Sequence, residues 1–148
     1  MSQTVLAPVD GTTIPLGDVP DPVFAGQLVG AGIAIDPLRE PGTVVAPADG
    51  RLLKLHPHAF VLLTAEGKGL LVHLGIDTVQ LDGDGFELLA QEGAEVTAGT
   101  PVVRWDPAAI EAGGRSPIVP VVVMDSAPDS IAAAAFGPVR VGSEIFTL

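Results

Sequence analysis

The sequence contains no cysteine and no tyrosine, and it has 7 lysine and arginine residues against 18 aspartate and glutamate residues. The absence of cysteine excludes disulfides, thiolate metal sites and cysteine nucleophiles, so any chemistry must use other side chains. The formal net charge of −11 repels nucleic-acid phosphates and anionic lipid surfaces. We therefore expect no nucleic-acid partner, and the charge favours a basic protein partner.

Long hydrophobic runs are also missing. The run from Ile118 to Met124 is interrupted by Pro120 and is much shorter than the roughly 20 residues that span a bilayer. Before Arg39 the chain contains neither lysine nor arginine, whereas an export signal begins with basic residues. We expect a cytoplasmic protein that is not inserted directly into the membrane.

The composition that is present indicates one folded β domain over residues 1–148. Hydrophobic residues make up 47% of the chain and charged residues 17%, which is typical of a globular protein. With 18 glycines and 14 prolines, long uninterrupted helices are excluded. Aromatic residues are few, so the core must consist mainly of branched aliphatic side chains, and these suit strands.

Apolar segments between turn residues predict an all-β fold, an antiparallel sandwich or barrel with one or two very short helices. Asp106 and Pro107 predict a helix start before Ala108–Ala112, which ends at Gly113, and a second helical turn is predicted over Asp129–Ala135. The predicted strands are Gly32–Ile35, Thr43–Val45, Arg51–Leu55, Ala59–Thr64, Leu70–Leu74, Pro101–Trp105, Ile118–Met124 and Glu144–Leu148.

Two pairs of segments are nearly repeated. Residues 7–11 (APVDG) resemble residues 46–50 (APADG), and residues 93–99 resemble residues 137–142; each segment leads into an apolar stretch. Internal duplication explains both pairs. The alternative is that a glycine-rich β protein uses the same turn chemistry several times.

The main chemical signal is the clustering of all three histidines, His56, His58 and His73, on two predicted strands. A four-residue loop over Ala65–Lys68 would place Phe60 opposite His73 and His58 opposite Gly75, so that both imidazoles share one face. A loop of three or five residues without a bulge would send them to opposite faces. Apolar neighbours lower the pKa of a buried imidazole and keep it neutral, so one ring can act as a nucleophile while the other orients it. Alternatively, both histidines are ordinary sheet residues.

Residues 58–60 (HAF) and 71–79 (LVHLGIDTV) resemble the paired active-site motifs of glucose-family IIA proteins of the bacterial phosphoenolpyruvate-dependent sugar phosphotransferase system. Residues 18–25, 29–35, 45–50, 83–86, 92–93 and 119–122 also resemble that family, so the likeness covers nearly the whole chain. It implies a β-sandwich with internal duplication, of the duplicated hybrid motif kind.

The resemblance also implies an activity and a set of site residues. A phosphocarrier of this kind accepts a phosphoryl group from phospho-HPr and passes it to a sugar-specific IIB domain of a IIB/IIC permease. His73 corresponds to the phosphorylated histidine, which attacks through Nε2, and His58 corresponds to the companion that stabilises the phosphoryl charge. The residues implied to contact HPr are Asp21 and Asp77, with an apolar patch that includes Val23, Phe24 and Val79.

One departure from the family pattern concerns His56, which stands where the family usually has a threonine that takes part in the hydrogen bonding of the active site. His56 either replaces that hydroxyl as a donor or points into solvent. The relay requires no cofactor, although related proteins bind zinc between the two histidines that correspond to His58 and His73. Glucose, N-acetylglucosamine and β-glucosides all remain open as the sugar.

Two other classes of protein share part of the pattern. A lysostaphin-like zinc hydrolase uses a His-x-His spacing such as His56–His58, and His73 and Asp77 could supply further ligands. A lipoyl- or biotinyl-carrier module would carry its cofactor on a lysine such as Lys68, but that lysine lacks the flanking methionines of such modules.

Overall fold

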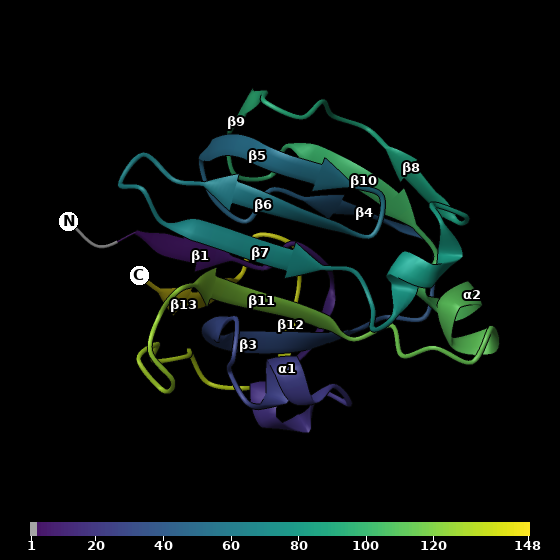
Figure 1. The fold of residues 1–148 in the computed structure, drawn as a ribbon, viewed down its shortest axis with the longest axis horizontal. Helices are drawn as coiled ribbons and strands as arrows, with labels where there is room; N and C mark the ends of the chain where they lie inside the picture. Colours follow the sequence, from purple (N-terminus) through teal and green to yellow (C-terminus); the bar gives the residue numbers. More distant parts are fainter. Residues whose placement is uncertain (1–2) are drawn as a thin grey trace.

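The computed structural model describes residues 3–148 and confirms the predicted all-β fold (Figure 1). The helical elements in this part of the chain are α1 (Pro22–Ala25), α2 (Pro107–Ala112) and the 3-10 turns η1 (Leu16–Asp18) and η2 (Thr78–Leu81). None of these helices is long and apolar enough to cross a membrane. The strands are β1 (Thr4–Leu6), β2 (Gly11–Pro15), β3 (Gly30–Pro37), β4 (Gly42–Val45), β5 (Gly50–His56), β6 (Ala59–Leu63), β7 (Gly69–His73), β8 (Phe86–Leu88), β9 (Glu95–Val96), β10 (Pro101–Trp105), β11 (Val119–Met124), β12 (Pro138–Val139) and β13 (Glu144–Thr147).

The strands form a large curved sheet backed by two smaller ones. The large sheet has the order β12-β2-β3-β11-β7-β6-β5-β9, the second has the order β4-β10-β8, and the third pairs β1 with β13. Figure 1 shows β4 and β10 behind β5 and β6. The buried cluster between the layers is mainly aliphatic, as predicted, and its largest fully buried side chains include Phe60, Ile33, Ile35, Leu52 and Leu62.

The predicted strands are confirmed, with ends that differ by no more than two residues. The predicted helix start at Asp106 is also confirmed, because its Oδ1 accepts hydrogen bonds from the amides of Ala108 and Ala109 at the start of α2. The helical turn predicted over Asp129–Ala135 is wrong. This segment lies along β13 instead: the Ala134 amide donates to the carbonyl of Ile145 at 2.9 Å, and Ala133 forms a bridge with Phe146.

The repeated segments occupy equivalent places and bind each other symmetrically. The Leu6 amide donates to the Pro47 carbonyl at 2.9 Å, and the Val45 amide donates to the Pro8 carbonyl at 3.0 Å. Leu6 and Val45 each precede a repeated segment, and Pro8 and Pro47 are each its second residue. The two bonds are therefore equivalent, with the roles of the two segments exchanged. This reciprocity confirms internal duplication of the structure rather than mere reuse of turn chemistry.

The second pair of repeats follows the same symmetry. The Asp10 carboxylate accepts from the Val141 amide at 2.7 Å, and the Asp49 carboxylate accepts from the Ala98 amide at 2.7 Å. Strand pairing is equivalent too, because β12 pairs with β2 as β9 pairs with β5, and β13 pairs with β1 as β10 pairs with β4. We call these eight strands the repeat frame.

The glycines that follow these aspartates explain why each repeat ends in Asp-Gly. A Cβ atom on Gly11 would lie 2.3 Å from the Asp36 carbonyl oxygen, and one on Gly50 would lie 2.4 Å from the Leu63 carbonyl oxygen. Real Cβ atoms do not approach oxygen so closely, so glycine permits the backbones to meet. The frame thus holds β3 and β6 in equivalent positions beside β2 and β5.

Candidate functional site

His58 and His73 lie at the same end of the large sheet. His73 is the last residue of β7, and His58 is the second residue of the Pro57–His58 turn that joins β5 to β6. In Figure 1 the arrowhead of β7 and the β5–β6 connection both lie at the end of the sheet near α2. The chain therefore brings the two histidines together through hairpin geometry.

The predicted register of the β6–β7 hairpin is wrong by one residue. Leu63 pairs with Gly69 and Ala59 pairs with His73, so the loop has five residues, 64–68, instead of four. The Thr64 amide donates to the Lys68 carbonyl at 2.9 Å, so Thr64 belongs to the loop and β6 ends one residue earlier than predicted, at Leu63. In a regular ladder, this register would place His58 on the face opposite His73.

The two imidazoles nevertheless meet, as predicted, because His58 belongs to a turn and not to a strand. Its carbonyl accepts from the Leu74 amide at 2.7 Å, which holds the turn beside the end of β7. The ring centroids of His58 and His73 are 5.3 Å apart, with the rings inclined at 73°. The predicted juxtaposition is confirmed, but turn geometry produces it and strand alternation does not.

The hydrogen bond made by His73 fixes its tautomer. Its Nδ1 lies 2.5 Å from the Gly75 carbonyl oxygen. A carbonyl can only accept, so Nδ1 carries the proton and Nε2 keeps its lone pair. Burial lowers the pKa of His73 below its ordinary value, although the Gly75 bond and the charges of Asp21 and Asp77 raise it in part. The ring is neutral near pH 7, with Nε2 available as a nucleophile.

His58 and His56 form a stacked pair beside this ring. Their ring centroids are 5.9 Å apart and their planes differ by 25°. Burial lowers the pKa of the half-buried His58, and the neighbouring His73 and His56 lower it further. His56 is exposed at the end of β5. The exposed position of His56 agrees with the alternative that its ring points into solvent, and the contact with His58 is a ring stack rather than the hydrogen bond of a donor.

The connection between β2 and β3 supplies the next part of the site. Asp21 caps α1, because its Oδ1 accepts from the Val23 amide at 2.8 Å, and Pro22 occupies the first helical turn. Phe24 is buried, and its ring centroid lies 5.2 Å from that of His73. Val23 on the same short helix is 43% exposed. Phe24 therefore supports the histidine from within, whereas Val23 faces outward.

Asp77 and Val79 follow His73 in the chain, Asp77 directly before η2 and Val79 within it. Asp77 is exposed and has a left-handed backbone with φ 59°. Val79 is 59% exposed. The predicted contact residues come from two separate segments of the chain: Asp21 and Asp77, one from each, are near enough for their charges to act on His73, and each segment also carries an exposed valine, Val23 or Val79.

Sequence reasoning gave no role to Gly75, Thr78 or Ser116. Gly75 has φ +85°, and a Cβ atom there would lie 2.7 Å from Thr78 Cγ2 and 3.0 Å from the Ser116 carbonyl. The same Ser116 carbonyl accepts from the Ile76 amide at 2.8 Å. Gly75 and Thr78 lie within the motif that contains His73, but their contacts depend on tertiary structure.

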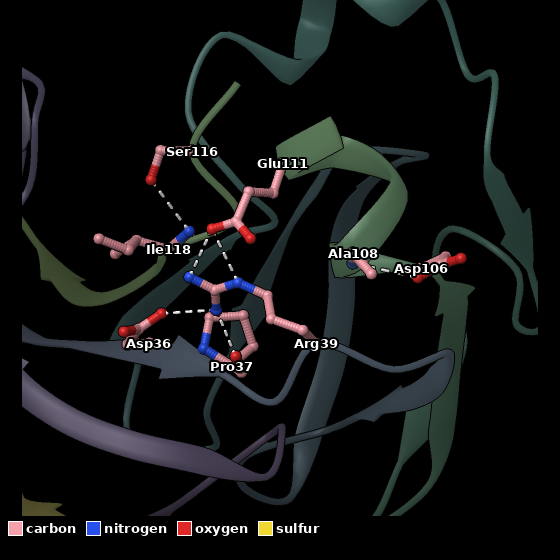
Figure 2. Close-up of polar contacts among 8 residues, drawn as sticks. All are labelled: Asp36, Pro37, Arg39, Asp106, Ala108, Glu111, Ser116 and Ile118. Atoms are coloured by element: carbon pink, nitrogen blue, oxygen red, sulfur yellow. Dashed lines mark hydrogen bonds and ion pairs between the residues drawn. The ribbon is translucent and has the colours of Figure 1, made fainter. Parts of the chain in front are cut away.

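Polar contacts fasten the segment that supplies Ser116 (Figure 2). The Arg39 Nε atom donates to Glu111 Oε2 at 3.0 Å and its Nη1 donates to Asp36 Oδ1 at 2.7 Å, so Arg39 links β3 to α2. The Ile118 amide donates to Ser116 Oγ at 3.3 Å. The bonds of Arg39 hold α2 beside β3, and the backbone bond from Ile76 to Ser116 holds the chain that follows α2 against the turn after β7.

The zinc-hydrolase and carrier-module alternatives find no support in this geometry. Within residues 3–148, no group of three or more His, Cys, Asp or Glu side chains is placed to hold a metal ion. His56, His58, His73 and Asp77 therefore do not form the ligand set that a zinc hydrolase requires. Lys68 is exposed in the β6–β7 loop, at the end of the hairpin away from His73.

Comparison with known proteins identifies the class to which this fold and site belong. Residues 3–128 match the family model described as phosphoenolpyruvate-dependent sugar phosphotransferase system, EIIA 1. The chain belongs to this family and is a IIA phosphocarrier component of the sugar phosphotransferase system.

Individual relatives agree with this assignment. The glucose-specific EIIA component of Staphylococcus aureus is 42% identical over 124 residues, which cover 82% of this chain and 74% of that protein. The corresponding protein of Bacillus cereus is 39% identical over 126 residues, covering 84% of this chain and 75% of that protein. The structure of the glucose permease IIA from Mycoplasma capricolum superposes with a TM-score of 0.90 at 34% identity, covering 99% of this chain and 96% of that one.

Proposed function

We propose that this IIA component accepts a phosphoryl group from phospho-HPr on Nε2 of His73 and passes it to a sugar-specific IIB domain in the cytoplasm. The observation that carries the proposal is the bond from His73 Nδ1 to the Gly75 carbonyl, which leaves Nε2 as the nucleophile. The ring of His58, 5.3 Å away, is the companion. The result is sugar uptake coupled to phosphorylation of the sugar.

In the transfer step, the lone pair of Nε2 attacks phosphorus while the bond between phosphorus and the donor protein breaks, and the donor keeps that electron pair. The His73 ring gains positive charge because its Nδ1–H remains in place. The Gly75 carbonyl and the charges of Asp21 and Asp77, which favour a charged ring, stabilise this developing charge. His58 donates a hydrogen bond to a phosphoryl oxygen, so positioning and charge stabilisation provide the catalysis.

The surface around the histidines fits a protein donor with a basic contact residue. Val23 and Val79 are exposed and would form the apolar centre of the interface, while Asp21 and Asp77 steer and orient the partner. Phe24 contributes from beneath, through its contact with His73. The same surface would serve the IIB acceptor, because both partners must reach Nε2.

The transfer requires no metal. A zinc ion held between His58 and His73 would occupy the lone pair of Nε2, because Nδ1 is already bonded to Gly75. Bound zinc would therefore inhibit phosphorylation, and a chelator should not reduce the activity of the purified protein. Loss of activity on chelation would contradict this mechanism.

Intact-mass measurement after incubation with enzyme I, HPr and phosphoenolpyruvate tests the proposal. We expect a gain of one phosphoryl group, which His73→Ala abolishes and His58→Ala retains, although the latter passes the group on poorly. The exposed histidine variant His56→Ala is the matched control and should still be phosphorylated. Phosphorylation of His73→Ala, or loss of phosphorylation in His58→Ala alone, would overturn these roles.

Because the relatives from Staphylococcus aureus and Bacillus cereus are glucose-specific components, we propose glucose as the sugar of the acceptor. Transfer from the phosphorylated protein to purified IIB domains for glucose, N-acetylglucosamine and β-glucosides tests this, with the glucose domain expected to be fastest. Faster transfer to either of the other domains would reassign the sugar and leave the role of His73 unchanged.

A further inference from the structure

A fully buried hydroxyl lies behind the turn that contacts His73. The side chain of Thr78 is 0% exposed, and its Oγ1 donates to the Leu74 carbonyl at 2.8 Å, with the Gly75 carbonyl at 3.5 Å. The Gly75 carbonyl is the acceptor for His73 Nδ1. The Leu74–Gly75 peptide therefore connects the hydroxyl of Thr78 to Gly75, whose carbonyl fixes the tautomer of His73.

That peptide unit cannot be held by solvent. Leu74 is 0% exposed, so water cannot replace a hydrogen bond lost from its carbonyl. On the other side of the turn, the Ile76 amide donates to the Ser116 carbonyl. The Ile76 bond holds the Gly75–Ile76 peptide, which carries the Gly75 carbonyl. The hydroxyl of Thr78 holds the preceding Leu74–Gly75 peptide through the Leu74 carbonyl.

The orientation of the Gly75 carbonyl decides which tautomer His73 adopts. The Gly75 carbonyl belongs to the next peptide, Gly75–Ile76, which is joined to the Leu74–Gly75 peptide at the Gly75 Cα atom. If the Leu74–Gly75 peptide is displaced, Gly75 moves with it, its carbonyl shifts away from Nδ1, and the preference for a proton at that nitrogen is lost. A proton on Nε2 removes the lone pair that attacks phosphorus. A small displacement behind the ring thus changes the fraction of the protein that can react.

We propose that Thr78 is a positioning residue for phosphoryl transfer, whose hydroxyl holds the Leu74–Gly75 peptide so that the Gly75 carbonyl maintains the Nδ1–H tautomer of His73. The kinetic consequence rests on the proposed function, because it requires His73 to be the nucleophile. The tautomer is measured on the unphosphorylated protein, so this measurement does not depend on whether His73 is the residue that accepts the phosphoryl group.

The ring nitrogens of His73 in the unphosphorylated protein provide the first test. Nitrogen-15 NMR at a pH where the ring is neutral should show the Nδ1–H form as the dominant tautomer in the wild type. Thr78→Val, which removes the hydroxyl and keeps the shape, should increase the Nε2–H form until it is readily detected. Thr78→Ser, which restores a hydroxyl, should return the spectrum toward that of the wild type.

The rate of phosphorylation by phospho-HPr provides the second test. We expect Thr78→Val to lower it by about tenfold or more, since small displacements of reacting groups have large effects on rate, and Thr78→Ser to recover most of it. Thr64→Val is the matched control: Thr64 is also buried and accepts from the Lys68 amide at 3.1 Å at the far end of the same hairpin. It should change neither the tautomer nor the rate.

The outcomes separate this proposal from the proposed function. If folded Thr78→Val keeps the wild-type tautomer and rate, Thr78 is only a structural residue and the proposal fails. If Thr78→Val does not fold, Thr78→Cys, whose thiol is a weak donor, must show an intermediate shift or the proposal fails. If wild-type His73 accepts no phosphoryl group, the proposed function fails, and the NMR spectra still decide the role of Thr78.

Discussion

The β2–β3 and β5–β6 hairpins occupy equivalent positions in the two halves of the repeat frame, yet their connections differ greatly. Pro57 and His58 alone join β5 to β6, whereas residues 16–29, with η1 and α1, join β2 to β3. Both connections contribute to one site. The short turn supplies His58, and the long connection supplies Phe24; the ring of each contacts the ring of His73.

This difference shows how a symmetric fold can hold an asymmetric site. The paired contacts of the frame, such as those of Asp10 and Asp49 at 2.7 Å, are nearly identical in the two halves and carry no active-site residue. The chemistry lies where the halves differ. Changes to the frame should therefore alter stability in similar ways in both halves, and changes to the connections should alter function.

The largest effect is expected from adding a methyl group to the frame glycines. Gly11→Ala and Gly50→Ala would each place Cβ within 2.4 Å of a carbonyl oxygen, so each should lower the free energy of unfolding by about 3 kcal/mol. Gly42→Ala, where no atom lies within 4 Å of the added Cβ, is the control and should change it little. Urea denaturation measures all three, and unequal effects at Gly11 and Gly50 would contradict the symmetry.

The next largest effect concerns the long connection. Phe24→Ala removes a buried aromatic ring and should lower the free energy of unfolding by about 3 kcal/mol, and it should also slow phosphorylation because His73 loses its support. Val23→Ala on the same helix is the comparison, because Val23 is 43% exposed. It should leave stability almost unchanged and weaken partner binding. If the two variants behave alike, the division between support and docking is wrong.

Most of the fold could be predicted from the sequence because strand patterns and turn residues are local. The α2 cap was predictable from Asp106 and Pro107, since both act on adjacent backbone groups. The segment after Asp129 was not, because its composition fits a helical turn while β13 provides the backbone partners that it actually uses. Strands as short as β8, β9 and β12 also lack a pattern of useful length.

The site could be predicted in its residues but less well in its geometry. The clustering of His58 and His73 indicated a functional pair, yet the meeting of the rings depends on a five-residue loop and a turn that compensate for each other. The support given by Phe24 and Thr78 depends on contacts between segments distant in the chain or folded tightly on themselves. Local patterns do not specify such contacts.

A smaller effect, on pH dependence, follows from burial of His73 beneath the long connection. Burial lowers the pKa of His73 below its ordinary value of 6.5. The neutral, reactive ring should therefore persist as the pH falls to 6.5, and the phosphorylation rate should drop at lower pH, through the pKa of the folded protein. NMR titration of the ring measures this pKa, and Phe24→Leu, which keeps most of the burial, should shift it less than Phe24→Ala. A titration midpoint of His73 above pH 6.5 in the wild type would contradict the lowering of its pKa by burial.

The same pKa predicts the direction in which stability changes. Because the folded state binds the proton of His73 less readily than the unfolded state, the contribution of His73 to stability is complete above pH 6.5 and is lost as the pH falls through the folded pKa. His58 contributes in the same direction, because its pKa is also lowered. Urea denaturation of His73→Ala should lack part of this decline, whereas an unchanged decline would assign it to other groups.

The smallest effect should distinguish the two halves of the frame most finely. Asp10→Ala and Asp49→Ala each remove a carboxylate that accepts from one backbone amide at 2.7 Å, and each should lower the free energy of unfolding by about 1 to 2 kcal/mol. Because the two bonds are equivalent, the losses should agree within the precision of urea denaturation. The two sites do not share a partner, so the double variant should show the sum of the single losses. A clear inequality would mean that the connections, and not the frame alone, determine how strongly each half is held.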